Sequence, residues 1–191
     1  MKKLAFFAAA LFVAGCVGTS RPSRFYNLNS VQPSDVIVTF PGKYRIAVDE
    51  VKIPSYLDKP QIVTAVPDSG QLDISEFNRW SEPLSTMLQR TVADDMSMYL
   101  PGSMVKPLAL YQEKFDYIVN IEINRFEGSF DGRTVLDAWW TVMDKRQNVV
   151  LSERSEFSEE TGKGYDNLVK TESRLVGSLS REISEKIAEL K

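Results

Sequence analysis

The clearest alternation of apolar and polar residues runs through residues 115–126. Phe115, Tyr117, Val119, Ile121 and Ile123 occupy every second position, and Asp, Asn or Glu stands at most of the positions between them. A period of two predicts a β-strand with one face on a core and the other face in water.

The next apolar segment, residues 134–143, predicts a strand with two apolar faces. A turn at residues 144–148 leads into a return strand over residues 149–157. Trp139 and Trp140 are adjacent, so their side chains point to opposite faces. One indole is therefore expected in the core, and the other is expected to be covered by a helix, a loop or another chain.

Shorter strand patterns occur in the first third of the chain. Residues 25–28, 44–53 and 62–66 are strand candidates, and Asp68-Ser69-Gly70 predicts a tight turn that returns the chain through Leu72 and Ile74.

Two segments have the three- and four-residue spacing of an amphipathic helix. Ser81 is a predicted N-cap, and the helix is expected to end near Leu100, before Pro101-Gly102. A last helix is expected from the Gly162-Lys163-Gly164 break to the C-terminus. Their apolar stripes are Leu84, Met87, Leu88, Val92, Met96 and Tyr99, and Leu168, Leu175, Leu179, Ile183, Ile187 and Leu190. Together the elements predict a single α+β domain over residues 24–191, with a mostly antiparallel or mixed sheet packed by two helices.

The N-terminus has the layout of an export signal. Lys2 and Lys3 precede an uninterrupted apolar run over residues 4–14, which is too short to span a bilayer because a spanning helix needs about 20 residues. We expect residues 1–15 to be removed as a signal peptide.

The cleavage region resembles the lipobox of bacterial lipoproteins, since Val13, Ala14 and Gly15 precede Cys16. Cys16 is the only cysteine of the chain, so it has no partner for an intramolecular disulfide. The lipobox implies an N-acyl diacylglyceryl lipid on Cys16 and no other cofactor. Two or more acyl chains anchor a protein stably. The alternative is a plain signal peptide with a chance cysteine.

Charge and tether length limit where the mature protein acts. Removing 15 of 191 residues leaves 176, and the loss of two lysines leaves 21 basic against 26 acidic residues, a net charge of −5. Nucleic acid is therefore not an expected partner. Residues 16–23 form the lipidated cysteine and a short tether, in which residues 17–23 extend at most about 25 Å, so the domain stays near its membrane.

The chain lacks the usual catalytic groups. It has no histidine, which removes His-dependent triads and His-ligated zinc, and no phosphate-binding glycine loop. We predict no metal site and no enzyme. Carboxylates alone can support a glycosidase, but the pairs Asp94-Asp95 and Glu159-Glu160 are expected to be solvated. Asp137, in an apolar strand, is the one acid singled out for a test.

Three segments resemble the ABC-type transport auxiliary lipoproteins, the PqiC-like family. They are residues 24–28 (Arg-Phe-Tyr-Asn-Leu), 53–63 (Ile-Pro-Ser-Tyr-Leu-Asp-Lys-Pro-Gln-Ile-Val) and 78–84 (Asn-Arg-Trp-Ser-Glu-Pro-Leu). The similarity covers most of the mature chain, and the middle segment is the most specific. Lys59 stands where the family mostly has Arg, which keeps the charge but loses a bidentate fork.

The resemblance implies a fold like the N-terminal domain of TolB and a place in lipid transport between two membranes. The implied partners are the inner leaflet of the outer membrane, reached through the lipid, and a periplasm-spanning MCE-domain protein of the PqiB type. Val17 agrees with outer-membrane sorting, because in enteric-type bacteria an Asp after the cysteine resembles an inner-membrane retention signal.

Several residues are candidates for partner binding, each with a structural alternative. In residues 53–63, Pro54 and Pro60 could instead fix a rigid loop whose tyrosine and leucine fill a corner of the core. Trp80 is expected to pack rather than to bind, and Trp140 is the hypothesised site of self-association or MCE docking. The candidates are Tyr56, Leu57, Asp58, Lys59, Gln61, Trp80 and Trp140.

The sequence leaves three functions open besides catalysis. The first is a docking or receiving component of an MCE-type lipid transport system. The second is an independent periplasmic lipid carrier, which needs an apolar cavity rather than a filled core. The third is a structural envelope lipoprotein unrelated to transport.

Overall fold

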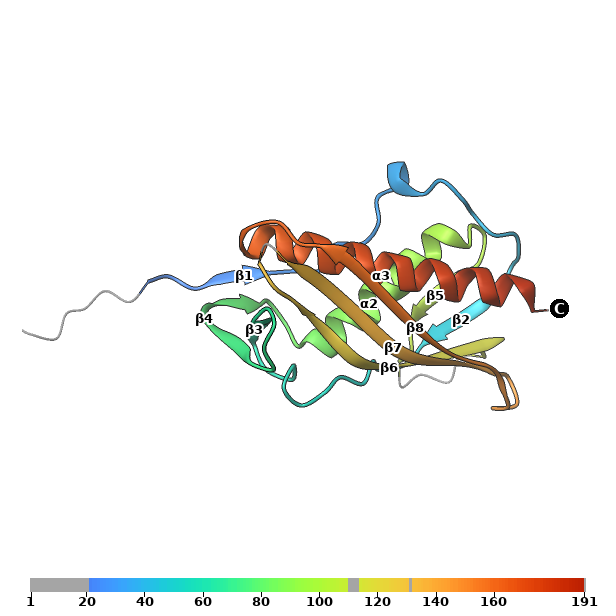
Figure 1. Cartoon of the computed structure of the whole chain (residues 1–191). Coiled ribbons are helices and arrows are strands. Elements are labelled where there is room, and N and C mark those ends of the chain that lie inside the picture. Colours follow the sequence, from blue (N-terminus) through green and yellow to red (C-terminus); the bar gives the residue numbers. More distant parts are fainter. Residues whose placement is uncertain (1–20, 110–113, 131, 191) are drawn as a thin grey trace, which may run out of the picture.

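A computed structural model describes residues 21–109, 114–130 and 132–190 (Figure 1). The lipobox residues and Cys16 lie outside this part of the chain. Along the sequence, the elements are β1 (Arg24–Tyr26), the 3-10 turn η1 (Pro33–Asp35), β2 (Arg45–Val48), β3 (Gln61–Ala65), β4 (Leu72–Trp80), α2 (Leu84–Tyr99), β5 (Met104–Pro107), β6 (Tyr117–Gly128), β7 (Arg133–Asp144), β8 (Val149–Glu160) and α3 (Gly164–Glu189).

The strands form one mixed sheet around β6. On one side, β6, β7 and β8 pair antiparallel in long ladders. On the other side, β2 runs parallel to the first part of β6 and also pairs with β5, while β3 meets the end of β6 and continues to β4 and β1. The predicted α+β class and the β3–β4 and β7–β8 hairpins are confirmed.

Both helices lie on the same face of the sheet, behind the strands in the view of Figure 1. The predicted stripes face the core: every stripe residue of α2 is buried, and so is every one of α3 except Leu190, which is partly buried. Alternate residues of β6 and β7, such as Ile121 and Trp140, pack beneath them. No helix in the described part of the chain is long and apolar enough to cross a membrane.

Several elements differ from the prediction. The strand expected over residues 44–53 ends at Val48, and the following segment stays beside β6 through irregular hydrogen bonds such as Lys52 N–H to Ile121 O. Ser81 is not an N-cap, because its hydroxyl contacts Asn27 and α2 begins after Pro83. The β5 strand was not predicted.

The two helices each carry a buried acidic side chain, Asp95 of α2 and Glu172 of α3. Asp95 was expected on the polar side of its helix, and this expectation was wrong. Its carboxylate accepts hydrogen bonds from Val31 N–H (2.8 Å) and from the Ser180 hydroxyl (3.4 Å) of α3. Burial raises the pKa of Asp95 to about 7, although both hydrogen bonds oppose that shift. Burial and the nearby Glu127 likewise raise the pKa of Glu172 in α3 well above its usual value.

We expect Asp95→Asn to change how stability depends on pH. Because the pKa of Asp95 is raised on folding, the protonated side chain contributes to the free energy of unfolding. This contribution is fully present below about pH 4 and is lost as the pH rises through 7. The amide keeps an acceptor for Val31 N–H and carries no charge. The variant should gain stability over the wild type between pH 4 and pH 8, by on the order of 1–4 kcal/mol. Denaturant unfolding at both pH values measures this gain, and a difference independent of pH would contradict the assignment.

Candidate docking surface

The face of the sheet opposite the helices is not covered by any described helix. We call it the uncovered face: the side of β6, β7 and β8 that bears Glu122, Trp139, Thr141, Ser152 and Arg154. Along each strand these residues alternate with the core residues, since successive side chains of a strand point to opposite faces.

The predicted division of the tryptophan pair is confirmed, but the choice of the exposed member was wrong. Trp140 is 1% exposed, whereas Trp139 is 48% exposed on the uncovered face. Trp140 Nε1 donates to Ser155 Oγ at 2.8 Å, which satisfies its only polar group within the core. Trp139 is therefore the indole that a partner can reach.

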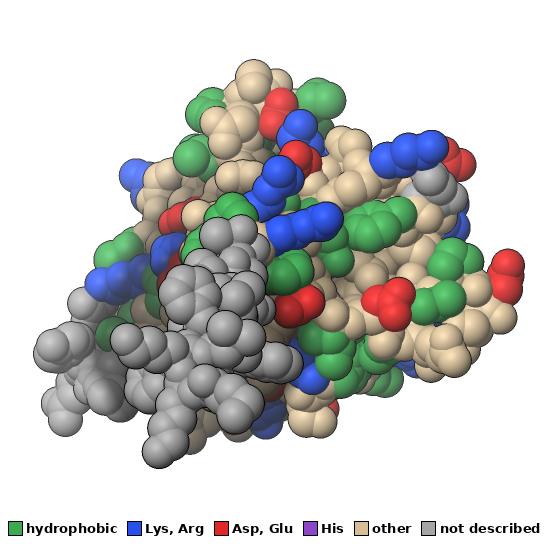
Figure 2. Space-filling model, turned by 90° about the vertical axis from the view of Figure 1, so that its left-hand side faces the viewer, with side chains coloured by type: hydrophobic (Ala, Val, Ile, Leu, Met, Phe, Trp, Pro, Cys, Tyr) green, Lys and Arg blue, Asp and Glu red, His purple; other side chains and the backbone are tan. Residues whose placement is uncertain are grey.

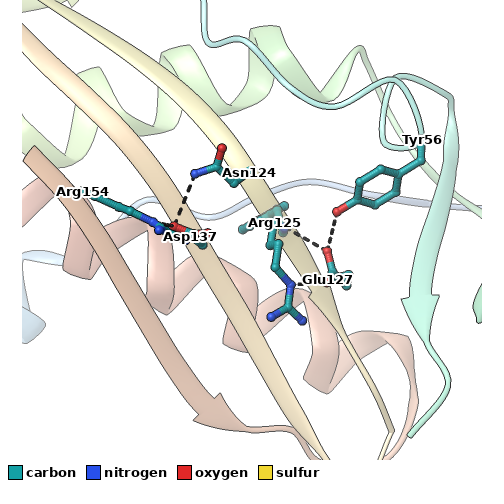
Figure 3. A network of polar contacts seen from close by, with 7 residues as sticks. Tyr56, Asn124, Arg125, Glu127, Asp137 and Arg154 are labelled. Carbon is teal, nitrogen blue, oxygen red and sulfur yellow. Dashed lines mark hydrogen bonds and ion pairs between the residues drawn. The ribbon is translucent and has the colours of Figure 1, made fainter. Parts of the chain in front are cut away.

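A polar network ties β6, β7 and β8 together (Figure 3), and its Arg154 is the residue of β8 directly opposite Trp139. Arg154 of β8 donates through Nε and Nη2 to the two oxygens of Asp137 on β7, at 2.9 and 2.8 Å. Asn124 of β6 adds a longer bond to the same carboxylate. These contacts, led by the Arg154 hydrogen bonds, hold the pKa of Asp137 below its ordinary value. Asp137, the acid proposed for a test from the sequence, is thus an ionised carboxylate paired with an arginine. Such a carboxylate is a poor general acid.

The segment over residues 53–63 is held to β6 by a second group of polar contacts, also drawn in Figure 3. The Tyr56 hydroxyl donates to Glu127 Oε2 at 2.6 Å, and Arg125 Nε donates to Glu127 Oε1 at 3.0 Å. Burial, followed by the hydrogen bond to Glu127, raises the pKa of Tyr56. Leu57 is buried in the core. These contacts favour the rigid-loop interpretation for Tyr56 and Leu57.

The remaining candidates are divided between the core and the surface. Trp80 is buried, so its role in packing is confirmed, and its backbone N–H donates to Pro60 O, which fixes the motif to the end of β4. Asp58 is exposed, and Lys59 and Gln61 are partly exposed. The structure therefore leaves three polar motif residues within reach of a partner.

A shallow groove with an excess of acid lies beside Trp139. One hollow of about 330 Å³ is lined by Trp139, Glu122 and Lys52, together with Asp49 and Glu50. A second hollow, of about 650 Å³, shares Asp49, Glu50, Lys52 and Glu122 and adds Asp58. We call the set Asp49, Glu50, Lys52, Asp58 and Glu122 the acidic groove.

The acidic groove combines four carboxylates with one ammonium group, and an exposed indole stands at one end. Aromatic residues are enriched in the buried centres of protein interfaces, and complementary charge guides association. The arrangement suits a partner segment that carries basic and apolar side chains. Trp139 and most of this groove lie outside the motif that was noticed in the sequence; only the double tryptophan pointed to it.

Comparison with known proteins shows the family of the chain. The family model described as the ABC-type transport auxiliary lipoprotein component matches residues 26–184. The chain therefore belongs to the ABC-type transport auxiliary lipoproteins, as its motifs indicated.

A curated relative supports this assignment over the full length. The chain is 30% identical to the intermembrane transport lipoprotein PqiC of Escherichia coli (strain K12), in an alignment of 193 residues that covers 100% of this chain and 98% of the relative.

Two crystal structures share the fold. One, of an uncharacterized protein, has a TM-score of 0.71 and 24% identity, covering 87% of this chain and 99% of the other. The other, of a protein from Xanthomonas campestris, has a TM-score of 0.66 and 15% identity, covering 86% and 95%.

Proposed function

We propose that this chain is anchored to the periplasmic face of the outer membrane by a lipid on Cys16 and docks a periplasm-spanning MCE-domain protein of an intermembrane lipid transport system. The observation that carries the docking role is the uncovered face, where Trp139 is 48% exposed beside the acidic groove. The family assignment and the similarity to PqiC supply the transport context.

The geometry favours docking over an independent lipid carrier. The region between the sheet and the two helices is filled by one continuous cluster of buried apolar side chains. A carrier needs an apolar cavity there to enclose acyl chains. A docking protein needs a rigid surface, which the polar network of Figure 3 provides around Trp139.

Self-association through the same face is a second candidate, because a half-exposed indole on a sheet can also meet a second copy. The excess of carboxylates in the acidic groove opposes this arrangement, since two copies would bring like charges together unless each groove met a basic surface of the other. A partner with basic side chains has no such cost.

Trp139→Ala is expected to weaken docking at least tenfold, because interface energy concentrates in buried aromatic side chains. The measurement is co-purification of the lipidated protein with the spanning MCE-domain protein, followed by titration of the purified pair. Met98→Ala is the matched control, since Met98 is similarly exposed on α2, away from the uncovered face. Equal loss in both variants, or none in Trp139→Ala, would contradict docking here.

The acidic groove predicts a salt dependence for the same pair. Raising the ionic strength should weaken wild-type binding, because exposed charges are screened over a Debye length of about 8 Å at physiological ionic strength.

A partner list that contained only cell-wall assembly proteins would instead favour the structural envelope lipoprotein.

A further inference from the structure

Large apolar side chains reach the surface at the end of the molecule where the N-terminal segment enters. Phe25 of β1 is 65% exposed and Ile74 of β4 is 55% exposed, and Leu72 and Phe130 are also exposed. We call these four residues the tether end. Figure 2 views this end and shows hydrophobic side chains interspersed with Lys and Arg beside the grey residues.

The strand register explains why these residues share one end. β1 runs parallel to β4 with Phe25 opposite Arg79, so the chain before Arg24 leads back toward the first residues of β4, Leu72 and Ile74. β1 and the β3–β4 hairpin lie at the same end in Figure 1.

Phe130 belongs to this end through a chain of aromatic contacts. Its ring lies 5.0 Å from that of Tyr165, and the Tyr165 ring lies 6.2 Å from that of Tyr26 in β1. The β6–β7 turn, which carries Phe130, and the first turn of α3 are therefore adjacent to β1.

The length of chain between Cys16 and the domain decides what this end meets. Five residue steps separate Cys16 from Arg21, the first described residue, which is about 17 Å when fully extended. An acylated Cys16 would therefore hold Arg21 within that distance of a bilayer surface, and the start of β1, eight steps from Cys16, within about 27 Å. The charged neighbours are balanced, because Arg21, Arg24 and Arg79 are offset by Asp73, Glu76 and Asp166.

We infer that the tether end rests on the outer-membrane leaflet, with Phe25, Leu72, Ile74 and Phe130 in the interfacial region of the lipid. This inference rests on the proposed lipid at Cys16. The contact adds to the anchor and fixes the orientation of the domain, so that the β7–β8 turn points away from the membrane. Because the local charge is balanced, apolar burial rather than headgroup charge drives the contact.

The test uses the full lipidated chain in vesicles of phosphatidylethanolamine and phosphatidylglycerol. Lipid blocks the thiol of Cys16, so a single cysteine introduced by Phe25→Cys or Ile74→Cys accepts an environment-sensitive dye uniquely. Val149→Cys is the control. The exposed fraction of Val149, 58%, is similar to that of Ile74, but Val149 follows the β7–β8 turn at the opposite end of the molecule. Brominated phospholipid then reports contact by quenching.

We expect a blue shift and several-fold stronger quenching at positions 25 and 74 than at position 149, with little change in high salt. Equal and weak quenching at all three positions in protein that still floats with vesicles would overturn the orientation while leaving the anchor intact. A blue shift without quenching would assign the surface to a second copy of the chain. Protein that does not float would instead overturn the lipid anchor.

Discussion

Trp140→Ala is expected to lower the free energy of unfolding by about 3–5 kcal/mol, the usual cost of removing a large aromatic side chain from a core. Trp140 is 1% exposed and lies opposite Ile121 of β6 and Glu153 of β8. Its Nε1 donates to Ser155 Oγ, whose hydroxyl donates in turn to Glu182 Oε1 of α3 at 2.8 Å. The substitution thus leaves a cavity and removes the indole donor to Ser155, the residue through which β8 bonds to α3.

Two variants separate these contributions in denaturant unfolding. Trp140→Phe keeps an aromatic ring in the core but loses the hydrogen bond to Ser155. It should lower the free energy of unfolding by about 1–2 kcal/mol more than Trp139→Ala does. Trp139→Ala should change stability by less than about 1 kcal/mol, as surface substitutions usually do. If Trp139→Ala destabilised the protein as much as Trp140→Ala, the assignment of the two faces would be wrong.

Cys16→Ser is expected to move the exported protein almost completely from the membrane fraction to the soluble periplasmic fraction. Serine offers no thiol for the diacylglyceryl group, and each buried CH₂ of an acyl chain contributes about 0.8 kcal/mol to membrane binding. The variant should be expressed behind an ordinary export signal, because an uncleaved precursor would itself remain with the membrane.

The control is the wild-type protein, with its own lipobox and Cys16, expressed from the same promoter. The mass of its N-terminal peptide is the direct readout. The wild type should carry the mass of three acyl chains at residue 16. An unmodified thiol in the wild type, or a serine variant that still floats with membranes in high salt, would contradict the lipid anchor.

Local patterns were enough to predict most of the elements. Alternation in β6 and the helical stripes of α2 and α3 each report one face buried over many residues, and short turns such as Asp68-Ser69-Gly70 join neighbouring strands. The adjacent tryptophans showed that one indole had to leave the core. They could not show which, because both faces of β7 carry apolar residues and the helices cover only one of them.

Contacts between segments far apart in the sequence could not be predicted from local patterns. The parallel pairings of β2 and β5 depend on which edge of β6 is free, and nothing local specifies it. Asp95 is paired with Val31, which lies 64 residues earlier, so its burial contradicts the local pattern. The Tyr56–Glu127 and Asp137–Arg154 contacts likewise form only after the sheet is assembled.

Photo-crosslinking in living cells tests the docking role most directly. A photoreactive phenylalanine analogue at position 139 should form an adduct with the periplasm-spanning MCE-domain protein, and the same analogue at position 98 on α2 should not. Adducts from position 98 alone, or none from position 139 in cells where the lipidated protein still co-purifies with that partner, would show that the uncovered face is not where the partner binds.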